Sequence, residues 1–193
     1  MASVNYTSTA TTEAIRIYYQ PRGITMTCHE KESNWAFIDM QNLHMGVKEK
    51  GWKIHWKRFR QYLEKEHNVT KAIVFIGYLK QNAGLYGSLI RSGFTIEFRP
   101  VKQLEDGTID GGNVDADLAS CVMDHKNDYD KAIIVADDGD YCRTIKSLDR
   151  QNKLKLIISS HSIEETSDLI KREIARRLLL SVHSIKDIVE FTN

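Results

Sequence analysis

The chain has 193 residues, which is enough for one domain with a full hydrophobic core plus appendages. Its formal net charge of +1 excludes a strongly basic nucleic-acid binder, so any such binding must come from a local basic patch. Three cysteines without CxxC spacing argue against a disulfide framework or zinc site and indicate a reducing, cytoplasmic setting, and no apolar run is long enough to span a membrane.

The first 34 residues are predicted to form an extension with a β-hairpin. The β-rich stretches 15–19 and 24–28 flank Gln20-Pro-Arg-Gly23, whose proline and glycine mark a turn. Apolar strands of this kind present a pairing edge. The hairpin is therefore expected either to extend the main sheet or to join two chains in a homodimer.

From residue 35 onward, apolar runs alternate with amphipathic segments. The runs predict strands at 35–39, 70–78, 94–98, 132–136 and 154–159, of which 94–98 alternates between apolar and polar residues and is therefore expected nearer the edge of the sheet. The segments between them predict helices at 54–68, 82–92, 113–124 and 143–151. This alternation predicts a three-layer α/β domain with a mostly parallel central sheet over residues 35–160. A capping box, Ser162-Ile-Glu-Glu165, predicts a C-terminal helical tail over residues 161–193.

Carboxylates follow two of the predicted strands. Asp39 ends the first strand, and Asp137, Asp138 and Asp140 follow the run 132–136. Helix capping explains one or two such acids, whereas a third is better explained by a divalent cation. Ligands of open α/β sheets bind outside the carboxyl ends of the strands, so we expect these acids to face water or a metal ion there.

Two further acids, Asp115 and Asp117, lie in the first turn of the helix that Asn113 is expected to cap. Side chains two apart on a helix diverge by about 200°, so both cannot face one ion. We predict Asp115 as the site residue and Asp117, with Asp137, as residues that support the site from outside. Oxygen ligands without histidine or cysteine are typical of Mg²⁺ or Mn²⁺.

Cations gather on and before the helix 54–68. Lys53, Lys57 and Arg58 are the best candidates for contacts with RNA phosphates, although such a run more often forms a solvated face.

Three motifs occur in the order and spacing of a known family: Phe37-Ile-Asp-Met-Gln-Asn42, Asn113-Val-Asp-Ala-Asp-Leu-Ala119 and Val135-Ala-Asp-Asp-Gly-Asp-Tyr141. Together they resemble the signatures of NYN domains, the PIN-like, LabA-type nuclease domains. The resemblance covers residues 35–160 and implies a PIN-like fold and a metal-dependent endoribonuclease, for which we expect single-stranded RNA as the substrate. By motif position it implies metal binding and catalysis by Asp39, Asp115, Asp138 and Asp140, with Asn42 as a polar catalytic residue.

The chain departs from the family pattern at several positions. Ala136 stands where serine is common, Asp137 where a small residue is common, and Cys121 where an acid is common, and a lysine before the second motif is absent. An RNA-binding or scaffold module that keeps the fold without turnover is therefore the alternative function. Two other classes that cluster acids at strand ends fit the sequence less well. A receiver domain needs an acidic pair at its first strand, whereas the pair here follows a late strand. A Toprim-like nuclease needs a glutamate where Asp39 stands.

Overall fold

The computed structural model describes residues 19–20, 23–24, 31–103, 109–111, 113–173 and 178–192. The chain divides into two units, residues 1–31 and residues 32–193. In the first unit, β1 (Tyr19–Gln20) and β2 (Gly23–Ile24) pair antiparallel, at the turn of the expected hairpin. The remaining hairpin residues, 15–18, 21–22 and 25–28, lie outside the described part of the chain.

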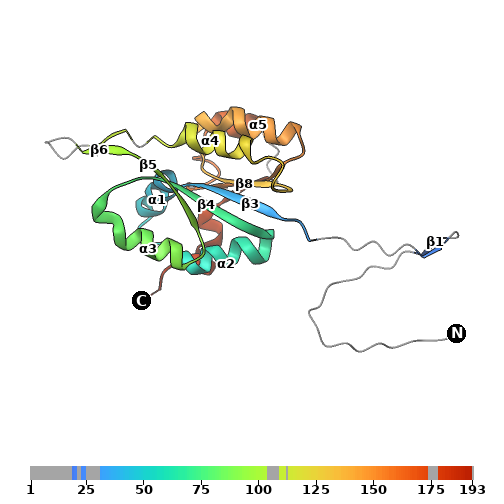
Figure 1. Ribbon diagram of the computed structural model, residues 1–193, viewed down its shortest axis with the longest axis horizontal. Coiled ribbons are helices and arrows are strands. Elements are labelled where there is room, and N and C mark those ends of the chain that lie inside the picture. The colour runs from blue at the N-terminus through green and yellow to red at the C-terminus, as the bar shows by residue number, and fades with distance from the viewer. Residues whose placement is uncertain are drawn as a thin grey trace. The chain divides into compact units, whose positions relative to one another are not determined.

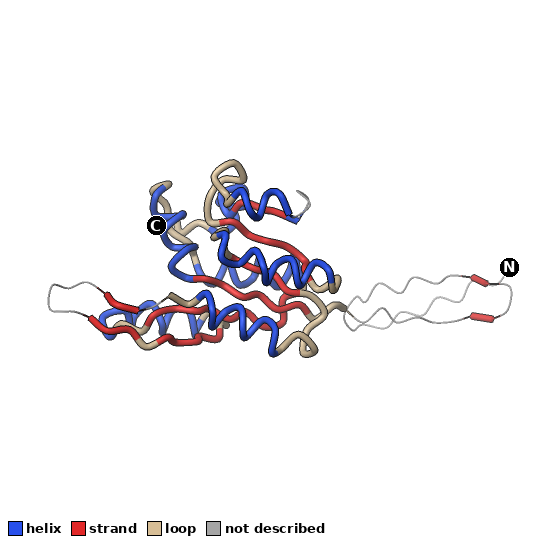
Figure 2. The backbone as a smooth tube through the Cα atoms, turned by 90° about the horizontal axis from the view of Figure 1, so that it is seen from above, coloured by secondary structure: helices blue, strands red, loops and turns tan. Residues whose placement is uncertain are grey.

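Parallel strands form the central sheet of the second unit, with helices on both faces (Figures 1 and 2). In spatial order the strands are β10 (Leu179–Ser181), β9 (Leu154–Ser159), β8 (Ala132–Val135), β3 (Asn34–Asp39), β4 (Val69–Gly77) and β5 (Thr95–Arg99). The strand order reverses between β3 and β8, in the middle of the sheet. Ligand sites of open α/β sheets lie at such a reversal. The predicted three-layer α/β fold is confirmed.

The helices of this unit divide between the two faces of the sheet. They are α1 (Met40–Glu49), α2 (Trp56–His67), α3 (Ala83–Arg91), α4 (Asp115–Asp124), α5 (Cys142–Arg150), α6 (Asp168–Glu173) and α7 (Lys186–Val189). Successive strand residues point to opposite faces. Ala36 and Ile38 therefore pack in the core under α1, α2, α3 and α7, whereas Phe37 packs in the core under α4, α5 and α6. Figure 1 shows α4 and α5 on one side of the sheet and α1, α2 and α3 on the other.

The C-terminal segment contains helices, as expected, but it also adds a strand. The capping box forms, because Ser162 N donates to Glu165 Oε2 at 3.1 Å and Glu165 N donates to Ser162 Oγ at 3.3 Å. It closes a turn rather than opening a helix, and α6 begins only at Asp168. Further on, Leu179–Ser181 pairs parallel with β9, because a sheet edge offers unpaired backbone groups to an extended apolar segment.

A second hairpin leaves the sheet after β5. Its strands β6 (Val101–Gln103) and β7 (Ile109–Gly111) pair antiparallel, and the turn expected at Asp106-Gly107 lies outside the described residues. Among the helices that the structure describes, none combines the length and the hydrophobicity that a membrane span requires.

Candidate active site

Asp39 lies where β3 becomes α1. As the N-cap of α1, its Oδ1 accepts a hydrogen bond from the backbone N–H of Asn42 at 3.0 Å. Its Oδ2 accepts a hydrogen bond from the hydroxyl of Tyr141 at 2.8 Å, and the residue is only 6% exposed. Burial raises the pKa of Asp39, and the nearby charge of Asp115 raises it further, against the lowering effect of these two hydrogen bonds.

Tyr141 joins Asp39 to a second carboxylate. It ends the 3₁₀ turn Gly139–Tyr141 and is almost completely buried. Its hydroxyl lies 2.8 Å from Asp39 Oδ2 and 2.6 Å from Asp115 Oδ1. Burial, together with the charge of Asp39, raises the pKa of Tyr141 and keeps the phenol protonated. The Tyr141 hydroxyl has one proton and donates it to only one of the two carboxylates at a time. The oxygen of the other carboxylate then faces a lone pair of the hydroxyl, unless a cation or a second proton lies between them.

A cavity of about 430 Å³ opens beside these carboxylates. Asp115 reaches it from the first turn of α4, where the helix dipole favours an acid. Asp138 follows β8, and its Oδ1 accepts a hydrogen bond from the backbone N–H of Asp140 at 3.2 Å. Because Ile38 lies opposite Val135, the ends of β3 and β8 leave the sheet side by side. The cavity is lined by Asp39, Gln41, Asn42, Met45, Gly111, Asn113, Val114, Asp115 and Asp138.

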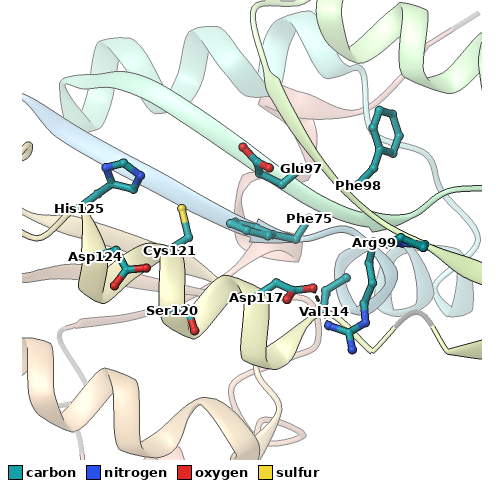
Figure 3. Close-up of a pocket in the computed structure, with 11 residues that line it drawn as sticks. Phe75, Glu97, Phe98, Arg99, Val114, Asp117, Ser120, Cys121, Asp124 and His125 are labelled. Atoms are coloured by element: carbon teal, nitrogen blue, oxygen red, sulfur yellow. Dashed lines mark hydrogen bonds and ion pairs between the residues drawn. The ribbon is translucent and has the colours of Figure 1, made fainter.

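Two of the predicted acids lie elsewhere. Asp140 is exposed and is not among the residues that line the cavity. Neighbours in a 3₁₀ turn are about 120° apart, so a turn that buries Tyr141 leaves Asp140 in solvent. Asp117 forms an ion pair with Arg99, Nη1 to Oδ2 at 2.7 Å, in a separate groove (Figure 3). As expected from their spacing on the helix, Asp115 and Asp117 therefore point to different surfaces, Asp115 to the cavity and Asp117 to the groove of Figure 3.

The chemistry of the cavity fits a hard divalent cation. Its acids offer only oxygen ligands, and no imidazole or thiol of the described residues lines it, which is typical of Mg²⁺ or Mn²⁺ sites. Asp39 and Asp115 share only the proton of a neutral phenol, so the negative charge of the pair is not balanced and a cation would be attracted there. Within the described residues, however, no three His, Cys, Asp or Glu side chains are grouped closely enough to hold an ion. Asp39 and Asp115 are therefore the pair that would hold it, with Asp138 acting through water, which Mg²⁺ readily retains.

Comparison with known proteins identifies the family. The family model described as the NYN domain matches residues 35–176, which is most of the chain. The protein belongs to the NYN domain family. The resemblance found in the three motifs is thereby confirmed, and with it membership of the PIN-like nucleases.

The NYN domain also has a structural neighbour. A crystal structure of a protein of unknown function from Vibrio parahaemolyticus matches it with a TM-score of 0.69 and 18% sequence identity. The match covers 86% of this chain and 100% of the other, and it shows a shared fold. No curated protein matches the chain significantly.

Asp137 of the NYN domain is buried, contrary to the expectation that all three acids after β8 face water or a cation. It is 6% exposed and accepts hydrogen bonds from Ser159 Oγ at 2.6 Å, Ser160 Oγ at 3.0 Å and the backbone N–H of His161 at 3.0 Å. Burial alone would raise the pKa of Asp137, but the hydrogen bonds from Ser159 and His161 and the charge of His161 outweigh it and lower that pKa. A buried carboxylate with this many partners needs no metal ion.

The same network fixes the amide of Asn42. Asn42 Oδ1 accepts a hydrogen bond from the backbone N–H of Asp137 at 3.3 Å, and it shares the single hydroxyl proton of Ser160 with Asp137, lying 2.7 Å from Ser160 Oγ. A backbone N–H can only donate, so the amide oxygen must face it, and Nδ2 is left for the cavity. Asn42 therefore offers the cavity a hydrogen-bond donor, which suits a phosphate oxygen better than a cation.

Sequence reasoning missed Tyr141, Ser160 and His161 as parts of the site. Tyr141 stands inside the third motif, but its role depends on a turn that points the ring inward. Ser159, Ser160 and His161 stand at the carboxyl end of β9. The rule that singled out Asp39 and Asp138, polar residues at the carboxyl end of a buried strand, would have found them too.

We expect Tyr141→Phe to lower the free energy of unfolding of the metal-free protein by about 1–3 kcal/mol, because Asp39 Oδ2 and Asp115 Oδ1 lose their shared donor. Urea unfolding in EDTA measures this loss. Adding Mn²⁺ should narrow the difference from wild type, since a cation between the carboxylates replaces the missing proton. A variant as stable as wild type in EDTA, or a difference that Mn²⁺ leaves unchanged, would contradict this account.

Proposed function

We propose that this NYN domain is a metal-dependent endoribonuclease, which uses Mg²⁺ or Mn²⁺ to hydrolyse phosphodiester bonds of single-stranded RNA. One observation carries the proposal: Asp39 and Asp115 converge on one phenolic proton beside a cavity that Asp138 and Asn42 also line. The proposal includes action in the cytoplasm, consistent with the free thiols of Cys121 and Cys142. It also includes a homodimer joined through the N-terminal hairpin.

The residues of the cavity divide the work of hydrolysis. A bound Mg²⁺ or Mn²⁺ supplies Lewis acidity toward a phosphoryl oxygen and lowers the pKa of an attacking water. Asp39 and Asp115 hold that charge, and Asp39 is oriented by hydrogen bonds at both of its oxygens. Asn42 donates from Nδ2 to a phosphate oxygen and positions the scissile group. Asp138, and Asp140 beside it in solvent, act through water.

The alternative is an RNA-binding or scaffold module without turnover. One observation favours it: among the described residues, no three metal-ligating side chains are in direct reach of one ion. The two functions differ in whether bound RNA is cut.

Cleavage of a labelled single-stranded RNA in Mn²⁺ tests the proposal. We expect wild-type protein to cut it, EDTA to stop the reaction, and Asp138→Asn to reduce the rate by at least about tenfold, the effect of removing a supporting group of a metal site. Asp149→Asn is the matched control, because Asp149 is an exposed acid on α5. Binding of RNA without metal-dependent cleavage would favour the scaffold module, and equal rates for Asp138→Asn and wild type would remove Asp138 from the mechanism.

A further inference from the structure

Two hollows meet at Trp56 on the face of the sheet that carries α1, α2 and α3. The first has a volume of about 440 Å³ and is lined by His44, Val47, Lys48, Gly51, Trp52, Lys53, Ile54, Trp56 and Leu85. The second has a volume of about 370 Å³ and is lined by Lys53, Ile54, His55, Trp56, Lys57, Ser88, Ser92 and Phe191. Lys53, Ile54 and Trp56 line both, so the two form one continuous surface, the Trp56 groove.

The charge of the Trp56 groove is entirely positive. Lys48, Lys53 and Lys57 are exposed along it, and among the residues that the structure describes no acid lines it. Within the described part of the chain, none of these three lysines forms an ion pair. Arg58, the third cation expected to contact RNA, is not among the residues that line the groove, and its Nη1 donates to the backbone oxygen of Glu190 at 3.1 Å. The groove thus presents cations free to meet phosphates.

The groove in Figure 3 has the opposite character. It lies between β5 and α4 and is lined by three acids, Glu97, Asp117 and Asp124, while its arginine, Arg99, is already paired with Asp117. Its lining would repel a phosphate backbone. Of these two surfaces, the Trp56 groove is therefore the one that suits a nucleic acid.

The aromatic rings of the Trp56 groove are held in place. Trp52 is buried, and its Nε1–H donates to His183 Nδ1 at 3.0 Å. Trp56 is half-buried and packs at 90° against Phe94, with ring centroids 6.4 Å apart. A ring that is already ordered loses little entropy when a base stacks on it, and base–aromatic stacking accepts any base.

Helix α1 connects the Trp56 groove to the acidic cavity. Asn42 and Met45 line the cavity, whereas His44, Val47 and Lys48 line the groove. Asn42 and Lys48 are six residues apart, which is about 9 Å along a helix axis. A single RNA strand can span that distance within a few nucleotides.

We propose that the Trp56 groove holds an unpaired base of the same RNA strand that is cut at the acidic cavity, stacked on Trp56, with Lys48, Lys53 and Lys57 contacting the neighbouring phosphates. The inference rests on the proposed function in taking RNA as the ligand. It adds a base-stacking subsite that any base can occupy. Charge complementarity selects RNA over an apolar peptide, because three unpaired lysines surround the apolar floor.

Fluorescence anisotropy with a labelled single-stranded oligouridylate in EDTA tests the subsite without cleavage. Trp56→Ala should weaken binding about 5- to 150-fold, the effect of one lost base stack, whereas Trp56→Phe should retain most of the affinity. An abasic oligonucleotide of equal length should bind the wild type and Trp56→Ala equally. Lys53→Ala and Lys57→Ala should each lower the slope of log affinity against log salt by about 0.7.

Tyr78→Ala is the matched control, because Tyr78 is 50% exposed and belongs to a different aromatic cluster, with Tyr86 and Phe98. Affinity that falls with Tyr78→Ala and not with Trp56→Ala would overturn the proposal. If Trp56→Ala does not fold, photo-crosslinking of wild-type protein to 4-thiouridine RNA decides the matter. Crosslinks in residues 44–57 are expected, and crosslinks confined to other peptides, or none, would overturn it.

These measurements separate the subsite from the proposed function. Stacking at Trp56 without metal-dependent cleavage would leave the subsite and refute the nuclease. Cleavage that is insensitive to Trp56→Ala, with unchanged binding, would leave the nuclease and refute the subsite.

Discussion

Asp39→Asn should lower the rate of Mn²⁺-dependent RNA cleavage by at least about a hundredfold, since a direct metal ligand should matter more than the supporting groups whose loss costs 10–100-fold. The metal-free variant should be as stable as wild type or more stable. The amide oxygen of the substituted side chain can still cap α1 at the backbone N–H of Asn42, and its NH₂ group can donate to the Tyr141 oxygen. In wild type, Asp39 and Asp115 compete for the proton of Tyr141, whereas in the variant Asp115 is the one carboxylate left to accept it.

The stability difference between Asp39→Asn and wild type should depend on pH. The pKa of Asp39 in the folded protein is raised above its usual 3.8. The contribution of Asp39 to the free energy of unfolding is therefore fully present below pH 3.8 and is lost as the pH rises through the folded-state pKa. The advantage of the asparagine variant should therefore be absent in acid and grow toward neutral pH. Urea unfolding in EDTA at several pH values measures it. Normal RNA cleavage by the Asp39→Asn protein would refute this role of Asp39. The role would also be refuted if the stability of the variant, measured relative to wild type, fell between acid and neutral pH.

Gly46→Ala should destabilise the protein by about 3 kcal/mol, the upper end of the usual cost of overpacking a core. A Cβ on Gly46 would lie 2.3 Å from the backbone oxygen of Ser160 and 2.7 Å from its carbonyl carbon. Backbone atoms cannot rotate away, so α1 must move from the end of β9. That movement would break the hydrogen bond of Ser160 Oγ to Asn42 Oδ1 and release the Asn42 amide. Cleavage should fall together with stability.

Gly84→Ala is the matched control for Gly46→Ala. Gly84 lies in α3 with nothing within 4 Å of an added Cβ, so alanine should stabilise the helix by about 0.5–1 kcal/mol. Thermal and urea unfolding of both variants measure the contrast. Similar changes in the two variants would show that the contact with Ser160 does not determine the effect.

The α/β architecture could be predicted because local sequence and global fold agree in most of the second unit. The apolar run at β8 is buried on both faces, and Leu154–Ser159 forms β9 as predicted. Asn68, with a φ of 54°, ends α2 in the left-handed conformation that asparagine tolerates. The C-terminal strand β10 could not be predicted, because three residues carry no clear period and become a strand only when β9 offers them an edge.

Within the candidate site, the sequence indicated which elements would bring acids together but not which atoms would meet. Asp39 and Asp138 follow from a simple rule, since carboxylates at the ends of buried strands must reach the edge of the sheet. The sequence placed Asp137 in a supporting position outside the metal site, but it gave no sign that the carboxylate is buried. Its burial depends on Ser159, Ser160 and His161, which stand at the carboxyl end of another strand, β9, about twenty residues later.

The sequence by itself determined the family, the parallel α/β architecture and the presence of Asp39, Asp115 and Asp138 at one edge, because those features depend on local period and strand ends. Only the tertiary structure decided that Asp39 and Asp115 share the proton of Tyr141, that Asp140 stays in solvent, and that Lys53 and Lys57 lie along a groove with Trp56. The physical reason is that these contacts join segments far apart in the chain. Their geometry depends on strand order, register and the direction of single turns, none of which a local pattern of residues specifies.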